Sequence, residues 1–187
     1  MSSGIDTALR RAAALVRDVP DYPQAGVLFK DITPVLADAA AFRAIVAAMA
    51  EPILGTGTGR GSGVAADVVV GVEARGFLLG AAVALAAGIG VVPARKAGKL
   101  PMVAASRDYQ LEYGSATLEL PSGVVGPGSR VFVVDDVLAT GGTLVASCEL
   151  VEQLGATVCG IGVLVELAAL GGRERLGARD LAAVFTY

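Results

Sequence analysis

The chain has 187 residues, of which 54% are apolar, and its formal net charge is −3. This length suits one domain, residues 1–187, with a sizeable core, and the lack of a basic block argues against nucleic-acid binding. No apolar run reaches membrane-spanning length, and the polar N-terminus lacks a secretory pattern, so we expect a cytoplasmic protein without membrane contacts.

Two side-chain types limit the possible chemistry. The two cysteines, Cys148 and Cys159, lie in apolar surroundings that predict buried thiols rather than a disulfide framework. The chain has no histidine, which removes the usual general base and the commonest metal ligand. Acid–base work therefore falls to a carboxylate, a lysine or a tyrosine.

Helical and extended patterns alternate along the chain. In the first half we expect a helix at 7–16, a turn at 20–26, an extended piece at 26–31, a helix at 39–49, a surface loop at 55–63, a strand at 67–72, a helix at 77–87 and a strand at 91–94. In the second half we expect a mobile loop at 96–106, a hairpin with strands 109–113 and 117–120, a strand starting at 131, a helix at 144–154, and strands at 158–165 and 182–186. This alternation predicts an α/β fold with a mainly parallel, twisted sheet and helices on both faces.

The most informative motif follows the strand that starts at Val131. Asp135 and Asp136 stand where this apolar run ends, and the turn Ala139-Thr140-Gly141-Gly142-Thr143 leads into a helix. Ligands of open α/β sheets bind at the carboxyl ends of the strands.

Each part of this turn suits a sugar phosphate. The glycines allow a tight turn whose N–H groups approach an anion, while two threonine hydroxyls and a helix N-terminus add donors. The two carboxylates are acceptors suited to a ribose diol. For the aspartate pair alone, an acidic turn before a capped helix is the better interpretation, but the whole run favours a phosphate site.

Two further segments carry charge near predicted strand ends. Glu73-Ala74-Arg75 ends a buried strand and opens a helix, where Arg75 either pairs with Glu73 at the surface or binds an anion. Arg95, Lys96 and Lys99 form a cationic group that is either a solvated loop or part of a lid over polyphosphate.

Two residues have a plainer alternative on pattern alone. Glu112 lies in a predicted edge hairpin, where such a carboxylate usually faces solvent, and Phe29 suits a core ring as well as a stacking platform.

The signature at 131–143 resembles the phosphoribosyl-diphosphate motif of the type I phosphoribosyltransferases. Five other segments, in the same order, resemble the adenine phosphoribosyltransferases within that family: Asp21-Tyr22-Pro23, the run 26–34, the run 71–77, the run 95–101 and Leu111-Glu112-Tyr113-Gly114. The resemblance covers the chain from about Pro20 to its C-terminus. It implies a type I phosphoribosyltransferase-like fold with a flexible lid, residues 96–118, and a small N-terminal hood that includes the base-binding segment, residues 1–34.

The resemblance also implies an activity. In that family adenine and 5-phosphoribosyl-1-diphosphate give AMP and pyrophosphate, with Mg²⁺ carried by the substrate and reached through water from Asp135 and Asp136. The implied adenine pocket is Leu28, Phe29 and Lys30, with the Phe29 ring stacked on the base. The enzymes of this family are commonly homodimers.

The implied pyrophosphate site joins the remaining charged groups. It consists of Glu73, Ala74, Arg75, Arg95, Lys96 and Lys99. The resemblance implies a cis peptide between Glu73 and Ala74, and an Arg95 that reaches the neighbouring subunit. Because no histidine is available, Glu112 is the expected catalytic group that transfers the proton at adenine N7.

Two alternatives to adenine salvage stay open from the sequence. A relative acting on hypoxanthine, guanine or xanthine would share the signature, although its base-reading segment near the C-terminus is not found here. A non-catalytic sensor of phosphoribosyl diphosphate would also keep the signature, but such proteins usually add a DNA-binding region.

Overall fold

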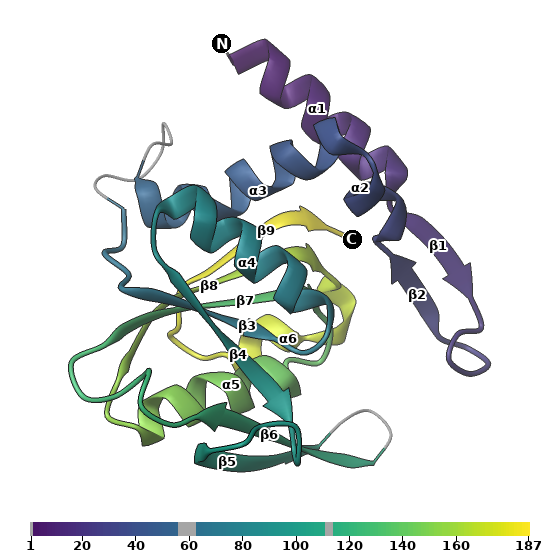
Figure 1. Cartoon of the computed structure of the whole chain (residues 1–187). Coiled ribbons are helices and arrows are strands. Elements are labelled where there is room, and N and C mark those ends of the chain that lie inside the picture. Colours follow the sequence, from purple (N-terminus) through teal and green to yellow (C-terminus); the bar gives the residue numbers. More distant parts are fainter. Residues whose placement is uncertain (1, 56–62, 111–113) are drawn as a thin grey trace. The chain divides into compact units, whose positions relative to one another are not determined.

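The computed structural model describes residues 2–55, 63–110 and 114–187. The described chain divides into two compact units, residues 1–48 and residues 49–187 (Figure 1). Most of the predicted loop at 55–63 and the predicted catalytic Glu112 lie outside the described residues. Among the helices that are described, none combines the length and apolar character needed to cross a bilayer.

The first unit contains helices and one small hairpin. Helix α1 (Ser2–Leu15) is followed by strand β1 (Arg17–Pro20), strand β2 (Leu28–Asp31) and helix α2 (Thr33–Ala37). Strands β1 and β2 pair antiparallel, with Asp18 opposite Lys30. The sequence predicted the extended piece at β2 but not its partner β1, because Arg17–Pro20 has no apolar alternation and gains its strand conformation from pairing.

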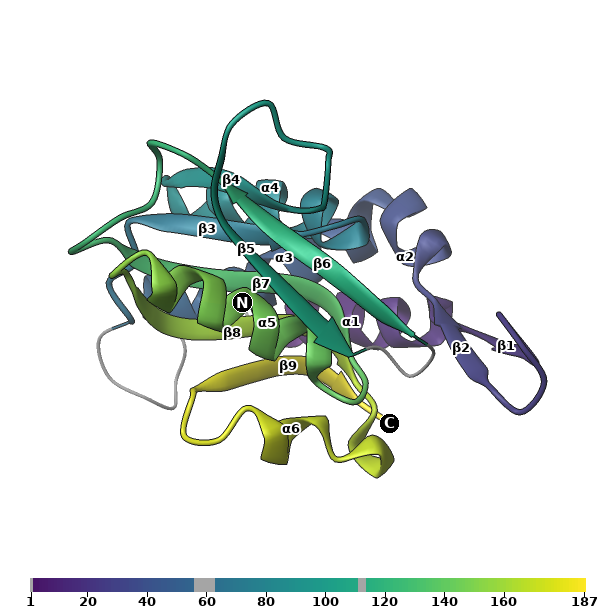
Figure 2. The ribbon, with the colours of Figure 1, turned by 90° about the horizontal axis from the view of Figure 1, so that it is seen from below.

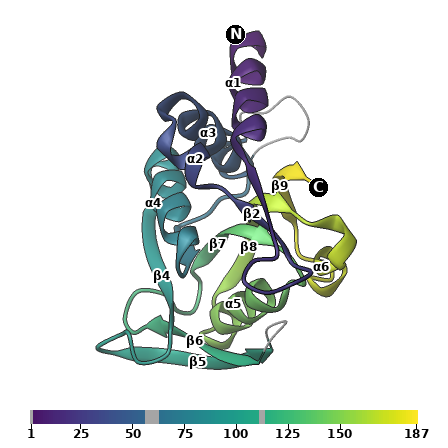
Figure 3. The same cartoon turned by 90° about the vertical axis from the view of Figure 1, so that its right-hand side faces the viewer.

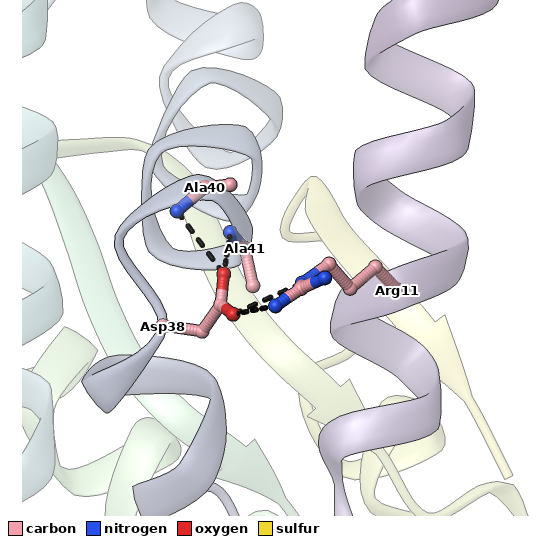
Figure 4. A network of polar contacts seen from close by, with 4 residues as sticks. All are labelled: Arg11, Asp38, Ala40 and Ala41. Carbon is pink, nitrogen blue, oxygen red and sulfur yellow. Dashed lines mark hydrogen bonds and ion pairs between the residues drawn. The ribbon is translucent and has the colours of Figure 1, made fainter.

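Helix α3 (Ala39–Leu54) starts at a strong cap in the first unit and ends in the second. Asp38 Oδ1 accepts hydrogen bonds from the backbone N–H groups of Ala40 at 3.1 Å and Ala41 at 2.9 Å, which satisfies donors that a helix start leaves open. The other carboxylate oxygen pairs with Arg11 of α1 (Figure 4). The helix was predicted to end at Met49 but continues past Pro52, since a proline in the last turn removes only one helical hydrogen bond.

The second unit is built on a twisted sheet. Its strands are β3 (Val68–Val72), β4 (Gly90–Lys96), β5 (Val103–Gln110), β6 (Ser115–Pro121), β7 (Arg130–Leu138), β8 (Thr157–Glu166) and β9 (Leu181–Thr186). Within the described ranges these seven strands form one sheet in the order β5-β6-β4-β3-β7-β8-β9. The five strands from β4 to β9 are parallel, and β6 and β5 add an antiparallel edge.

Helices cover both faces of this sheet, as the alternating pattern predicted. Helix α4 (Arg75–Ala87) lies on one face of the central strands and helix α5 (Gly142–Gln153) on the other (Figures 1 and 3). A short 3₁₀ turn (Ala168–Leu170) and helix α6 (Gly172–Arg175) connect β8 to β9. The interior strands β3, β7 and β8 are rich in valine and almost fully buried, as expected of parallel strands covered on both sides.

The predicted mobile loop at 96–106 is corrected in part. Residues from Val103 onward belong to β5, which pairs with β6 from Val103 opposite Pro121 to Gln110 opposite Ser115. Figure 2 shows these two strands as a long extension beside β4. The segment around Ala104 has weak strand propensity of its own, so its conformation depends on cross-strand bonds to β6 and on burial of Ala105.

Candidate active site at the carboxyl ends of β3 and β7

Two acidic side chains lie in the last part of β7, which runs further than its apolar core suggested. Asp135 and Asp136 are 7% and 6% exposed, although both are charged types. Asp135 Oδ1 accepts a hydrogen bond from the backbone N–H of Asp136 at 2.8 Å. Burial raises the pKa of Asp135 well above its ordinary value, and the neighbouring charge of Asp136 raises it further.

A cation from the adjacent strand end pairs with this acidic pair. Strand β3 lies beside β7, and helix α4 begins at Arg75, directly after β3. The Nε atom of Arg75 lies 2.5 Å from Asp136 Oδ2. Arg75 thus pairs with Asp136 inside the site, whereas the sequence had left open a surface pairing with Glu73.

The segment before α4 carries the backbone feature that the resemblance implied. The peptide bond between Glu73 and Ala74 is cis. Glu73 instead contacts the other cationic group: its Oε2 accepts from the backbone N–H of Lys96 at 2.9 Å and lies 3.4 Å from Arg95 Nε. Arg95 also stacks over the Phe77 ring, 5.7 Å from its centroid, and donates to the carbonyl of Lys99 at 3.4 Å.

The predicted phosphate loop, residues 139–143, connects β7 to α5. Gly141 has φ of +84°, a left-handed conformation that favours glycine, and α5 begins at the next residue. The loop begins directly after β7 ends at Leu138, two residues beyond Asp136, and the N-terminus of α5 lies within it. The loop thus places a left-handed glycine and a helix N-terminus, features suited to an anion, next to two buried carboxylates.

The structure adds Tyr109, which the sequence placed only at the start of a hairpin strand. The side chain of Tyr109 on β5 packs against the core near α5. Burial raises the pKa of the Tyr109 hydroxyl, hydrogen bonding with the Thr143 side chain lowers it, and the charges of Asp135 and Glu73 raise it. No local pattern could show that this ring lies beside the phosphate loop, since the contact joins two distant segments.

The edge hairpin is also tied to α5 by charge. Arg107 Nε on β5 lies 2.6 Å from Glu149 Oε2 on α5. Asp108 Oδ1 accepts a hydrogen bond from the Thr117 hydroxyl at 2.6 Å across the two strands. The hairpin that precedes and follows residues 111–113 is thereby held against the helix that begins at the phosphate loop.

The predicted base-binding segment lies in the first unit, on β2. The ring of Phe29 makes an edge-to-face contact with Tyr22, with ring centroids 5.1 Å apart. The side chain of Lys30 is 9% exposed, and its Nζ lies 2.6 Å from Asp18 Oδ1. Leu28 is half exposed.

The carboxylates of the site limit how a divalent cation could be held. Among the described residues, no group of three or more carboxylate or cysteine side chains is arranged to hold a metal ion. The two adjacent carboxylates Asp135 and Asp136 fit a cation that is bound mainly by substrate oxygens and water, which is the usual manner of Mg²⁺.

Comparison with known proteins gives one consistent result. Residues 36–181 match the family model described as a phosphoribosyl transferase domain. The chain is 58% identical, over 182 residues, to the adenine phosphoribosyltransferase of Saccharopolyspora erythraea, covering 97% of this chain and 94% of that protein.

Solved structures agree with the sequence relatives. The adenine phosphoribosyltransferase of Thermoanaerobacter pseudethanolicus superposes with a TM-score of 0.87 at 44% identity, covering 96% of this chain and 99% of that one. The Saccharomyces cerevisiae adenine phosphoribosyltransferase, solved with an imino-altritol bisphosphate and adenine, gives a TM-score of 0.85 at 35% identity, covering 96% and 99% of the two chains.

Proposed function

The chain belongs to the adenine phosphoribosyltransferase family, and from this premise we propose that it transfers the 5-phosphoribosyl group of phosphoribosyl diphosphate to adenine, giving AMP and pyrophosphate. Such a reaction salvages a free purine base. The observation that carries the proposal is the juxtaposition of three groups at one sheet edge: the buried pair Asp135 and Asp136, the loop at 139–143, and Arg75 against Asp136.

Each of these groups has a role in the proposed reaction. Asp135 and Asp136 hold the two ribose hydroxyls, because carboxylates accept hydrogen bonds and the low exposure strengthens them. The N–H groups of Ala139, Thr140, Gly141, Gly142 and Thr143 and the two threonine hydroxyls hold the 5-phosphate.

The leaving group needs positive charge. Breaking the bond between C1 of ribose and the diphosphate leaves pyrophosphate, and Arg75, Arg95, Lys96 and Lys99 are the cations that neutralise it. Arg75 must move from Asp136 to the diphosphate as the ribose hydroxyls occupy that carboxylate. Mg²⁺, when bound with the substrate, supplies further charge neutralisation on the diphosphate oxygens.

Adenine enters from the face of C1 opposite the leaving group, so the configuration at C1 inverts. In this proposal the Phe29 ring stacks on the base, while backbone groups of Leu28 and Lys30 read its edge. The buried ammonium of Lys30 is already paired with Asp18, which supports a role for its backbone rather than its charge. Glu112 takes up the proton at N7, and closure of residues 96–118 excludes the water that would hydrolyse the sugar.

The subunit arrangement and location complete the proposal. We expect a cytoplasmic homodimer that binds no nucleic acid or membrane, with Arg95 contributing to the neighbouring subunit's site. Sedimentation of the purified protein at micromolar concentration measures the oligomeric state. A monomer would exclude a role of Arg95 in the neighbouring subunit's site.

A direct assay tests the activity. Purified protein is incubated with Mg²⁺, phosphoribosyl diphosphate and each of adenine, hypoxanthine, guanine and xanthine, and the nucleotide products are measured by mass spectrometry. AMP as the main product is expected. A 6-oxopurine nucleotide as the main product would identify the other purine class, and no product with intact sugar-phosphate binding would identify a sensor.

The catalytic assignment has its own test. Glu112→Gln removes the proton acceptor but keeps the shape of the side chain, so kcat should fall about 10²-fold or more while affinity for phosphoribosyl diphosphate is kept. An unchanged kcat would exclude Glu112 from proton transfer.

A further inference from the structure

The segment after β8 contacts the back of the phosphate loop at three consecutive carbonyl groups. The carbonyl of Leu138 accepts a hydrogen bond from the backbone N–H of Leu167 at 2.9 Å. The carbonyl of Thr140 accepts one from the Arg175 guanidinium at 3.1 Å. These two bonds hold the ends of a short stretch of loop backbone from the same side.

Between those two bonds the backbones touch without any side chain. A Cβ atom added at Gly172 would lie 2.1 Å from the carbonyl oxygen of Ala139, and one added at Gly141 would lie 2.8 Å from the carbonyl oxygen of Gly172. Real Cβ atoms essentially never come this close to another atom, so a side chain at either position would force the backbone to shift. Residues 167–175 are therefore packed directly against the carbonyls of residues 138–140.

This arrangement sets the direction of the loop N–H groups. The peptide bonds of this stretch are trans, and in a planar trans peptide the C=O and the next N–H point to opposite sides. With three carbonyls turned toward residues 167–175, the N–H groups of Ala139, Thr140 and Gly141 point the other way. Successive N–H groups on one side form a concave binding site for an anion.

The supporting segment is itself fixed by an ion pair whose carboxylate is buried. Glu166, at the end of β8, is 6% exposed. Arg173 donates to both of its carboxylate oxygens, from Nε at 2.8 Å and from a terminal nitrogen at 2.6 Å. A two-bond pair of this kind restricts orientation as well as distance. Glu166 thus holds the backbone from which Gly172 and Arg175 reach the loop.

We propose that Gly172 and Arg175 are positioning residues for the 5-phosphate of phosphoribosyl diphosphate, acting by holding the loop carbonyls away from the ligand so that the loop N–H groups face it. The inference rests on the proposed function, and it assigns a role in binding to a segment about 30 residues beyond the signature. Arg175 acts from behind the loop, through the Thr140 carbonyl.

The experiment compares Arg175→Ala and Arg175→Lys with the matched control Arg179→Ala. Arg179 also donates to a backbone carbonyl, that of Leu176, but its guanidinium pairs with Glu152 away from the loop. Calorimetry measures the affinity for ribose 5-phosphate and, separately, for pyrophosphate with Mg²⁺. Steady-state kinetics measures KM for phosphoribosyl diphosphate and kcat.

Arg175→Ala should weaken ribose 5-phosphate binding about tenfold, the size of one charge-assisted hydrogen bond, and raise KM for phosphoribosyl diphosphate by a similar factor. Pyrophosphate affinity and kcat should change less than about twofold. Arg175→Lys should recover part of the loss, because an ammonium can also donate to a carbonyl. Arg179→Ala should match the wild type in both affinities.

Four outcomes would overturn the inference. Unchanged ribose 5-phosphate affinity in Arg175→Ala would show that the loop keeps its shape without this bond. Equal weakening of both ligands would indicate a general structural loss, as would the same effect in Arg179→Ala. A Gly172→Ala variant that folds and binds ribose 5-phosphate normally would also contradict it.

The binding measurements stand apart from the activity assay. If the wild-type protein binds ribose 5-phosphate but makes no AMP, the proposed function fails while the role of Arg175 can still be decided from affinities alone. If AMP is formed and Arg175→Ala binds normally, only the inference fails.

Discussion

Replacing Asp136 by asparagine should weaken substrate binding without weakening the fold. The Asp136 carboxylate is buried next to Asp135 and lies 2.5 Å from Arg75 Nε through Oδ2. Asp136→Asn keeps the size of the side chain but removes its charge. The change in stability therefore depends on which charge effect is larger, the repulsion from Asp135 or the attraction to Arg75.

The repulsion is relieved in the variant. Burial raises the pKa of Asp135, and the charge of Asp136 raises it further. A carboxyl group whose pKa is higher in the folded than in the unfolded protein lowers the free energy of unfolding once the pH exceeds the unfolded pKa, about 3.9. This loss of stability grows until the pH reaches the folded pKa, and it persists at pH 7. Removing the charge of Asp136 lowers the pKa of Asp135 and so recovers part of this loss.

The lost attraction is smaller. The side chain of Arg75 is 36% exposed, so water can solvate its guanidinium in the variant, and the pair contributes about 1 kcal/mol or less. We therefore expect the free energy of unfolding at pH 7 to stay equal or to rise by about 1 kcal/mol. A mutation that raises stability and lowers function is typical of a binding site in which neighbouring groups of like charge are kept together because the ligand needs both.

Binding should change in the opposite direction. A ribose hydroxyl that donates to a charged carboxylate contributes about 1.5–3 kcal/mol, so ribose 5-phosphate affinity should fall about 10- to 150-fold. Asp135→Asn combined with Asp136→Asn should reduce sugar diphosphate binding below detection.

The assay is urea unfolding at pH 7 with calorimetry on the same samples, and Asp67→Asn is the control. Asp67 precedes the opposite end of β3 and pairs with Arg130 of β7 at 2.8 Å at an exposed position. The control should lose a little stability and keep full affinity. A loss of more than about 2 kcal/mol in Asp136→Asn with intact affinity would refute both the repulsion and the diol assignment.

Three further predictions concern the core, the first unit and the thiols. Phe132→Ala should lower the free energy of unfolding by about 3–5 kcal/mol, because the ring is 1% exposed and packs on Gly160 and Gly162. Urea unfolding measures this change, and a loss under about 1 kcal/mol would contradict the prediction. Arg11→Ala should lower Tm near neutral pH, because the hydrogen bond from Arg11 holds the pKa of Asp38 below its ordinary value. This stabilisation is present above the pKa of Asp38 in the unfolded chain and is lost as the pH falls through its pKa in the folded protein. A Tm difference between variant and wild type that persists at pH 2 would therefore argue against stabilisation by the Arg11–Asp38 pair. Burial raises the pKa of the Cys148 thiol to about 12. Native protein treated with iodoacetamide at pH 8 should therefore keep Cys148 unmodified, as measured by peptide mass spectrometry. Alkylation as fast as in urea-unfolded protein would show that the thiol is accessible.

The local pattern of the sequence determined the centre of the sheet and its acidic turn. Valine-rich strands such as β3 and β7 are apolar along their whole length because parallel strands are buried on both faces. Turn residues such as Gly141 follow from a backbone conformation that other residues avoid. These properties depend on neighbours within a few positions in the chain, so they can be read without tertiary contacts.

Strands that depend on a distant partner were missed or shortened. Strand β1 and the first half of β5 each contain only one β-branched residue, Val19 and Val103, and their conformation comes from hydrogen bonds to β2 and β6. A strand of this kind gains its stability from cross-strand pairs, which a single segment does not reveal.

The partners of charged side chains were decided only by the tertiary structure. Arg75 could pair with the nearby Glu73 or with a residue far along the chain, and the adjacency of β3 and β7 directs it to Asp136. Arg175 meets the carbonyl of Thr140, 35 positions away, because β8 returns beside β7 and brings residues 167–175 behind the loop. Long flexible side chains can reach many partners at similar local cost, so the choice is made by which strands lie side by side.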